Sequence, residues 1–248
     1  VLYQNRKLSW VQVAHICEAI YTPLTEDYWD SRNIIRASAK RQIYWAGNGA
    51  AAAKLRPSKR RWMVKHTTEI YGYGKWMQRW NQWDHARCPC CTQREDIQHI
   101  ARCTHAGAVA SWEQSLEKLA AWFSHNETHP GVTQLLLARL NAWRSHQETR
   151  FPIPRIPALQ TAYLDQQEIG WFNFLQGRIS THWVTIQSEY YRLLESRRTG
   201  NTWARQLITH LWDVTWKMWL HRNHILHEMP NAESKKLSRK LDRRIAKE

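Results

Sequence analysis

The sequence predicts an all-α protein with two helical lobes, the first of them braced by a small metal-binding knuckle. Apolar side chains recur at helical spacing along most of the 248 residues. Glycine and proline are scarce, with nine and eight residues, whereas the sixteen tryptophans are several times the usual share. Four of the five cysteines fall between Cys88 and Cys103 beside histidines, which favours metal binding over a framework of extracellular disulfides.

The first lobe is predicted to span residues 1–150 and to begin with two amphipathic helices. One covers Ser9 to Ile20, and the other covers Asp27 to Trp45. Gly47-Asn48-Gly49 should end the second helix, unless a new helix simply starts with Ala50 to Leu55.

An aromatic segment follows in the same lobe. Tyr71-Gly72-Tyr73-Gly74 predicts a turn, and Trp76, Trp80 and Trp83 then have the i, i+4, i+7 spacing of one helix face. Packing of this face against a neighbouring helix is favoured over a platform that stacks on nucleic-acid bases.

Two core helices are expected before the boundary between the lobes. They cover Ala110 to Phe123 and Thr133 to Trp143, where apolar residues keep helical spacing. The three prolines of the segment Phe151 to Pro157 remove backbone donors and favour extended geometry. We therefore place the boundary there.

The second lobe, residues 151–248, is predicted to contain three helices and a basic tail. Gly177 and Gly200 lie where helix ends are expected, and Thr202 is a candidate cap for the last helix. Its apolar stripes cover more than half its circumference, so it should be the central helix of the lobe. The three helices are expected over Ala158 to Leu175, Thr181 to Ser196, and Thr202 to about Glu228.

The tail begins at Ser234 and sets three apolar residues among many lysines and arginines. Leu237, Leu241 and Ile245 would lie on one side of a helix. Such a helix either docks on a partner or a phosphate backbone, or forms a solvated surface, and the sequence leaves both interpretations open.

The charge of the chain favours a polyanionic partner. The 36 Lys and Arg residues exceed the 21 Asp and Glu residues by a formal charge of +15. Each phosphate contact releases condensed counterions, so nucleic acid is favoured over an acidic membrane surface. The densest basic segment before the C-terminus is Lys54 to His66, in which Trp62 is a candidate for base stacking. The residues predicted to contact nucleic acid are Lys54, Arg56, Lys59, Arg60, Arg61, Trp62, Lys65, Lys75, Arg79 and Arg222.

The cysteine cluster has the spacing of a metal site. Cys88 and Cys91 form C-x2-C, and His99 and Cys103 are four residues apart, on one face of a short helix. Zinc favours four tetrahedral nitrogen and sulfur ligands, and a closed shell leaves no place for a catalytic water. The sequence therefore predicts one structural Zn²⁺ ion bound within residues 88–103.

Several neighbours of the cluster remain open. Glu95 and Asp96 are expected to complement the dipole at the start of the short helix. His85 and His105 are alternative ligands, and Cys90 is a spare thiol. A redox pair at C-x2-C is less favoured, because no thioredoxin-like strand and helix surround it.

The cluster resembles the zinc-binding module that follows the polymerase domain of many non-LTR-type retrotransposon reverse transcriptases, algal members among them. The similarity extends to the segments at 60–66 and 74–80 upstream, and to IGWFNFLQGRISTHW and WKMWLHRNHILH downstream, so it spans roughly residues 43–228. Residues of the pattern C-P-x-C, acidic, H-apolar-x2-C are Cys88, Pro89, Cys91, Glu95, Asp96, His99, Ile100 and Cys103.

The resemblance implies a region that assists template binding and target-primed reverse transcription. The chain has no Tyr-x-Asp-Asp motif and no room for a palm domain before residue 43, so polymerase activity is not carried over. It would be a fragment of such a protein or a domesticated relative. We expect no catalytic residues, an intracellular protein in the nucleus or cytoplasm, and no membrane association. RNA or DNA is the expected partner. A larger protein or ribonucleoprotein assembly is a further candidate partner.

Two other functions are weighed. One is a structural or assembly subunit whose tryptophan-rich helices and basic tail bind other protein chains. The other is a nuclease, but Asp165 with Glu168 and Glu113 with Glu117 have spacings better explained by solvated helix faces. In the string His221-Arg222-Asn223-His224, Arg222 and Asn223 are expected to hydrogen-bond a neighbouring loop or helix end.

Overall fold

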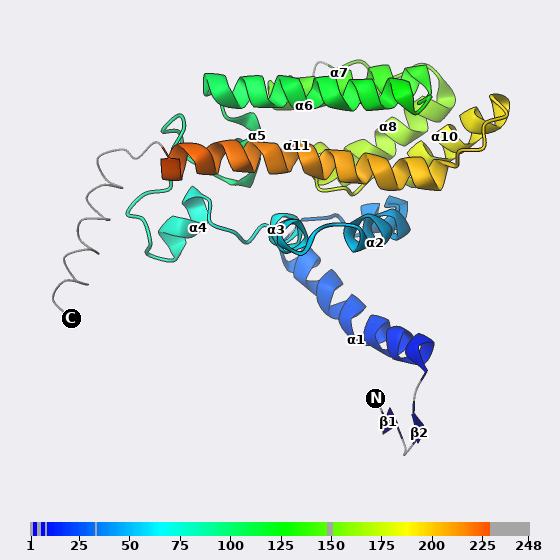
Figure 1. Cartoon of the computed structure of the whole chain (residues 1–248), viewed down its shortest axis with the longest axis horizontal. Helices are drawn as coiled ribbons and strands as arrows, with labels where there is room; N and C mark the ends of the chain where they lie inside the picture. The colour runs from blue at the N-terminus through cyan, green and yellow to red at the C-terminus, as the bar shows by residue number, and fades with distance from the viewer. Residues whose placement is uncertain (1, 4–5, 8, 33, 148–150, 229–248) are drawn as a thin grey trace.

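One long helix, α11 (Gly200–Glu228), runs through the middle of the protein in the computed structural model (Figure 1). On one side of it lie α6 (Ala106–His125) and α7 (Pro130–Arg144), and on the other lie α2 (Trp45–Ala53) and α3 (Pro57–Thr67). The structure describes residues 2–3, 6–7, 9–32, 34–147 and 151–228, so the predicted tail helix from Ser234 lies outside the described residues.

The other elements complete an all-α fold, as predicted. A hairpin of two-residue strands, β1 (Leu2–Tyr3) and β2 (Arg6–Lys7), is the one pair of named strands in the described residues. No described helix combines the length and the apolar character needed to cross a membrane. The remaining helices are α1 (Trp10–Ser31), the 3-10 helix η1 (Ala39–Gln42), α4 (Gly74–Arg79), α5 (Ile97–Arg102), α8 (Pro157–Ile169), α9 (Trp171–Leu175) and α10 (Thr181–Leu193).

The predicted central role of the last helix is confirmed. Leu207, Leu211, Val214 and Met218 form a buried stripe along α11, because residues three and four apart share one helix face. The indole N–H of the adjacent Trp212 donates to the Gln176 carbonyl at 2.8 Å, so burial of this ring leaves no polar group unpaired.

The proline segment predicted as the lobe boundary connects α7 to α8. Buried residues before it, such as Leu136, and after it, such as Leu159, belong to one connected hydrophobic cluster. Helix α11 packs against α2, α5 and α6 from the first half and against α9 and α10 from the second. The two halves therefore share a core along α11.

The N-terminal helix boundaries differ from the predicted ones. Helix α1 continues past Ile20, through Pro23, to Ser31, and the expected helix over Asp27 to Trp45 is instead the end of α1, a loop and η1. Gly47-Asn48-Gly49 lies inside α2 and does not break it. A Cβ at Gly47 would lie 2.9 Å from Ile208 Cδ1, so this glycine permits close packing of α2 on α11.

The expected tryptophan face is also different. Helix α4 ends at Arg79, and Asn81 has a positive φ of 55°, so Trp76, Trp80 and Trp83 do not share a helix. Trp76 is buried, while Trp80 is 43 % exposed. The spacing of the tryptophans predicted one continuous helix. The left-handed backbone conformation of Asn81 instead ends the helix and turns the chain towards the cysteine cluster.

One predicted helix and one glycine position in the second half differ from the structure. The expected helix over Ala158 to Leu175 is split into α8 and α9 by Gly170, whose φ is 97°. Gly200 begins α11 rather than ending a helix, and the cap is the hydroxyl of Thr199, which accepts from the Thr202 N–H at 3.2 Å.

Gly177 and Gly49 provide a matched stability test. Gly177 has a φ of 87°, and a Cβ there would lie 2.8 Å from Trp212 Nε1, so Gly177→Ala should lower the free energy of unfolding by more than about 1 kcal/mol. Gly49 lies within α2 with no atom within 4 Å of its Cβ position, so Gly49→Ala should raise stability by about 0.5–1 kcal/mol. Urea unfolding followed by circular dichroism measures both, and equal effects would contradict the assigned backbone conformations.

Candidate metal centre and basic surface

The cysteine loop folds as a small hairpin ahead of α5. Arg87 and Arg94 form an isolated antiparallel bridge, the Cys88 N–H donates to the Gln93 carbonyl at 2.7 Å, and Thr92 adopts a positive φ of 64°. These bonds close a tight turn that directs the Cys88 and Cys91 thiols towards the same point.

Helix α5 supplies the other two groups. Asp96 is its N-cap, as expected, and its carboxylate accepts from the His99 N–H at 2.8 Å. His99 lies within α5 and Cys103 is its C-cap, so the two side chains leave the same side of the helix. Arg144 of α7 fixes this end by donating to the Cys103 carbonyl at 2.9 Å.

The four predicted ligands converge, so three cysteines and one histidine form a group that could hold a metal ion. Their ligand atoms all lie within 4.8 Å of one another. Cys88 Sγ is 3.9 Å from Cys103 Sγ, and Cys91 Sγ is 3.2 Å from His99 Nε2. Tetrahedral zinc, at about 2.3 Å from sulfur and about 2.0 Å from nitrogen, would place such pairs about 3.8 and about 3.5 Å apart.

The electrostatics of the group also fit a cation. Hydrogen bonding to the Cys103 thiol, together with burial, raises the pKa of Cys88 well above its ordinary value. Crowded thiols resist ionisation because thiolates repel one another, and a divalent ion supplies the compensating charge. Burial lowers the pKa of His99, which keeps its ring neutral and available as a nitrogen ligand.

The alternative ligands serve elsewhere. The Nδ1 atom of His85 accepts from the Arg87 N–H at 3.2 Å, and Nδ1 of His105 accepts from the Gly107 N–H at the start of α6. Cys90 lies beside the group, where its N–H is 3.4 Å from Cys88 Sγ. None of these three belongs to the converging set.

Glu95 has a role that was not predicted. It does not face the start of α5; its carboxylate is fully buried and pairs with the guanidinium of Arg222, with N–O distances of 3.0 and 2.9 Å. The same carboxylate accepts from the Gly74 N–H at 2.5 Å. The cysteine loop, the start of α4 and the last turns of α11 therefore meet at one charge.

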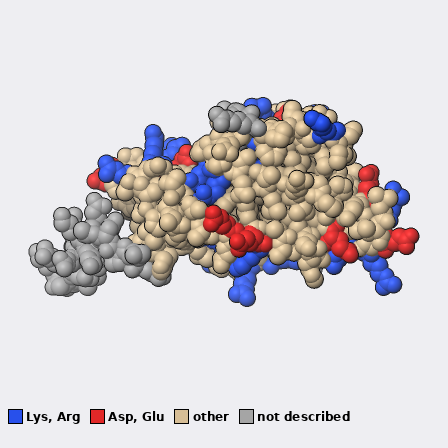
Figure 2. Space-filling model, turned by 90° about the horizontal axis from the view of Figure 1, so that it is seen from above, with Lys and Arg blue, Asp and Glu red and all other residues tan. Residues whose placement is uncertain are grey.

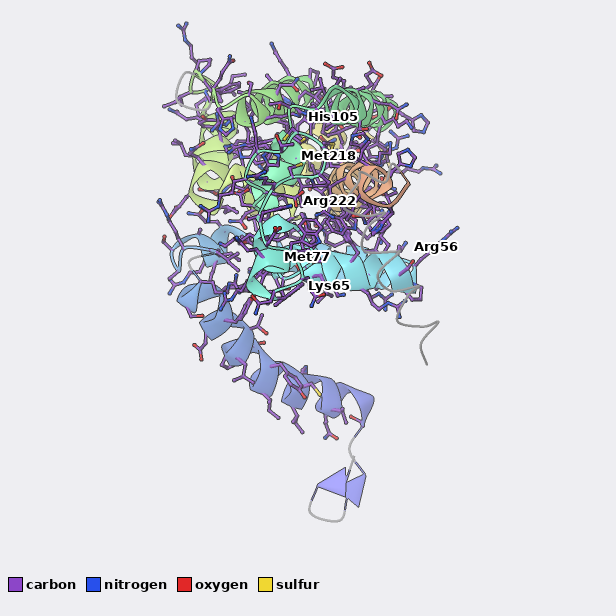
Figure 3. All side chains as sticks on the ribbon, turned by 90° about the vertical axis from the view of Figure 1, so that its left-hand side faces the viewer. Arg56, Lys65, Met77, His105, Met218 and Arg222 are labelled. Atoms are coloured by element: carbon purple, nitrogen blue, oxygen red, sulfur yellow. The ribbon has the colours of Figure 1, made fainter. Side chains whose placement is uncertain are left out.

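This pairing confirms that Arg222 binds a neighbouring loop and corrects its assignment as a phosphate contact. Arg222 is 3 % exposed, so a nucleic-acid backbone cannot reach it, and its side chain lies within the protein in Figure 3. The i, i+1 neighbour Asn223 accepts from it at 3.2 Å. A sequence gives no sign of such a pair, because 127 residues separate its members.

The basic segment forms helix α3, one side of which is buried. Trp62 is 6 % exposed, stacks on His66 with ring centroids 4.8 Å apart, and meets the edge of Trp216 in α11. The assignment of Trp62 as a base-stacking residue is therefore wrong. Burial, followed by the nearby Arg178 charge, lowers the pKa of His66 to about 3, so this ring is neutral in the core.

Two of the predicted basic contacts have internal partners. The ammonium of Lys59 pairs with Asp213 of α11. The guanidinium of Arg60 donates to the Ala52 and Ala53 carbonyls at 3.0 and 2.8 Å, which satisfies the end of α2. The first role of both side chains is therefore to hold α3 against α11 and α2.

The other basic residues face solvent. Lys54, Arg56, Arg61 and Lys65 are exposed and form no ion pair with a described residue. Arg56 and Lys65 mark the two ends of α3 in Figure 3, and Arg56 projects outward. Lys75 and Arg79 are exposed on α4, where the Arg79 guanidinium lies 4.9 Å from the Trp76 ring. We refer to Lys54, Arg56, Arg61 and Lys65 as the basic surface.

Two further cations near the pair of Lys59 and Asp213 were not identified from the sequence. Burial, and then the neighbouring Lys118 of α6, lower the pKa of Lys217 in α11. Lys217 lies one turn beyond Asp213, the partner of Lys59, so α3, α11 and α6 bring lysines together. By contrast, the face above α6 and α7 in Figure 2 shows few Lys and Arg side chains across its centre.

Of the two acidic pairs considered for nuclease chemistry, Asp165 and Glu168 have structural partners, whereas Glu113 and Glu117 lie exposed on α6. Asp165 accepts from the Ser180 hydroxyl at 3.2 Å and lies 2.5 Å from His182 Nδ1. Glu168 binds Ser38 and Gln42, which fastens α8 to η1.

Comparisons with protein-family models, with curated proteins and with solved structures found no match to the chain.

Substitution of one cysteine tests the ligand set. Cys91→Ser should remove most of the bound metal, because a hydroxyl is a poor ligand for zinc at neutral pH. Cys90→Ser, one residue away, should retain one full equivalent, because Cys90 is outside the converging group. Metal analysis of both purified proteins is the measurement, and full metal content in Cys91→Ser would remove Cys91 from the site.

The buried ion pair gives a second prediction. Arg222→Met should lower the free energy of unfolding by about 3–5 kcal/mol, because it leaves the Glu95 carboxylate buried without its cation. Arg198→Met breaks the half-exposed pair with Glu127 and should cost at most about 1 kcal/mol. Urea unfolding of the two variants compares the pairs directly. Equal losses would mean that Glu95 does not depend on Arg222.

Proposed function

We propose that the protein binds nucleic acid through the phosphate backbone, with its basic surface as the contact and a structural Zn²⁺ ion holding the cysteine loop. The observation that carries this proposal is the basic surface itself. It presents four exposed cations, and the sequence from residue 54 to residue 68 contains no Asp or Glu. Cations without neighbouring carboxylates keep their full attraction for phosphates.

The arrangement supports backbone contacts in preference to recognition of bases. The expected stacking residue, Trp62, is buried, while the exposed members of the surface are Lys and Arg side chains that suit phosphate oxygens. Lys217 and Lys118 would extend the same contact across α11 towards α6. RNA and DNA share the phosphate chemistry that these residues would bind.

Zinc is the ion that the donor set favours. Three thiolates and one imidazole close a tetrahedral shell and leave no position for a reacting water, so the ion would stabilise the fold. Together with the resemblance of the cysteine motif, this supports a nucleic-acid-binding region related to those that follow retroelement polymerases, assisting template or target binding without a polymerase site of its own.

An assembly subunit that binds other chains through tryptophan-rich helices has less support. That hypothesis requires exposed tryptophan side chains, but many of the indole rings are buried in the core of the protein. These buried rings are Trp62, Trp76, Trp112, Trp143, Trp171, Trp183, Trp203 and Trp212.

Charge reversal tests the proposed surface. In Arg61→Glu/Lys65→Glu, affinity for single- and double-stranded oligonucleotides should fall at least about tenfold for all sequences alike, and the slope of log affinity against log salt should shrink by about 1.5. Fluorescence anisotropy across a salt series measures both quantities.

The matched control changes the same charge away from the basic surface. Arg192 is exposed on α10, and the double variant Arg192→Glu/Arg197→Glu should bind with nearly unchanged salt dependence. If both double variants lose affinity equally, net charge alone explains binding and the assigned surface is wrong. If neither loses affinity, the protein does not bind nucleic acid through α3.

A further inference from the structure

Helix α1 leaves an apolar stripe uncovered. The helix extends away from the other helices in Figures 1 and 3. Ile16, Ile20 and Leu24 are spaced by four residues along one face, and they are 42 %, 55 % and 61 % exposed. Exposed apolar rows of this kind mark a surface that another segment covers.

The charge of α1 is opposite to that of the chain as a whole. The helix contains Glu18, Glu26, Asp27 and Asp30 and has no Lys or Arg, although the formal net charge of the protein is +15. Of these acids, Asp30 pairs with Lys40 at 2.8 Å. A partner for the stripe should therefore be apolar on one side and basic around it.

One segment of the chain has that pattern. Residues 234–248 lie outside the described residues, and their sequence, SKKLSRKLDRRIAKE, contains seven Lys and Arg residues and two acidic residues. Leu237, Leu241 and Ile245 have the same four-residue spacing as the α1 stripe. A helix with this sequence would offer an apolar row flanked by cations.

Contacts through α4 connect the last part of α11 with the C-terminal end of α1. Near the end of α11, Arg222 binds Glu95, which accepts from the N–H of Gly74 at the start of α4. At the end of α1, the Arg32 guanidinium lies 5.5 Å from the ring of Trp76, also in α4. About eight residues separate α11 from Leu237, enough to span about 26 Å in extended form.

We propose that the C-terminal segment docks on the exposed stripe of α1 as an antiparallel amphipathic helix. Leu237 would face Leu24, Leu241 would face Ile20, and Ile245 would face Ile16. The antiparallel direction is chosen because α4 links α11, through Glu95, to the C-terminal end of α1, through Arg32 and Trp76. Its Lys and Arg residues would then lie along α1, whose sequence contains acidic residues and no Lys or Arg.

Hydrogen exchange in the full chain tests this docking with two matched pairs. Leu241→Asp and Ile20→Asp place a charge in the apolar contact, so each should speed exchange of the α1 amides at least about fivefold. Ala246→Asp and Ala19→Asp add the same charge away from the two stripes and should leave that exchange nearly unchanged. If Leu241→Asp has no effect on α1, the proposal is overturned.

A second measurement identifies the occupant and the register. Cys17 is exposed beside Ile20, so in the variant Leu241→Cys, oxidised glutathione should form a disulfide between Cys17 and the introduced thiol within one molecule. Ser238→Cys, placed off the proposed stripe, should crosslink to Cys17 at least about fivefold more slowly. Crosslinks only between two molecules, or a dimer whose mass is unchanged by Leu241→Asp, would assign the stripe to a second copy and contradict the proposal.

Discussion

The buried pair of Glu95 and Arg222 is the constraint on which the arrangement of the protein depends. A fully buried carboxylate in a medium of low dielectric constant needs its charge and lone pairs matched. Arg222 supplies the charge, and the Gly74 N–H supplies a further hydrogen bond. Because Glu95 lies between the two halves of the cysteine motif, these contacts join the proposed metal centre to the central helix and to α4.

This connection explains how a small metal centre could support a surface some distance along the chain. Helix α11 contacts the cysteine loop through Arg222, which pairs with Glu95. It contacts helix α3 through Trp216, whose ring packs edge-on against Trp62. A neutral His66 stacks beneath Trp62, so the inner side of α3 is fixed by aromatic contacts. The outer side of α3 carries the exposed cations Arg61 and Lys65. In the proposed function, the metal would thus affect nucleic-acid binding only indirectly, by fixing the position of α3 on α11.

Local patterns in the sequence predicted what depends on local chemistry. The all-α class, the central last helix and the convergence of Cys88, Cys91, His99 and Cys103 followed from periodicity and ligand spacing. Contacts between distant residues could not be predicted: Trp62 and Arg222 were assigned to a nucleic-acid surface because a sequence does not show which side of a helix is covered. The glycine at position 47 was misjudged in part for the same reason, since a Cβ there would meet Ile208 of α11 as well as the nearby Tyr44.

The central claim is that metal binding is coupled to the end of α11 through Glu95, and hydrogen exchange with and without metal tests it most directly. After zinc is removed by a chelator, amides in residues 216–228 should exchange at least about tenfold faster. Those in residues 203–212, where Ile208 lies against Gly47 of α2, should change little. Equal exchange at residues 216–228 in both states would contradict the coupling.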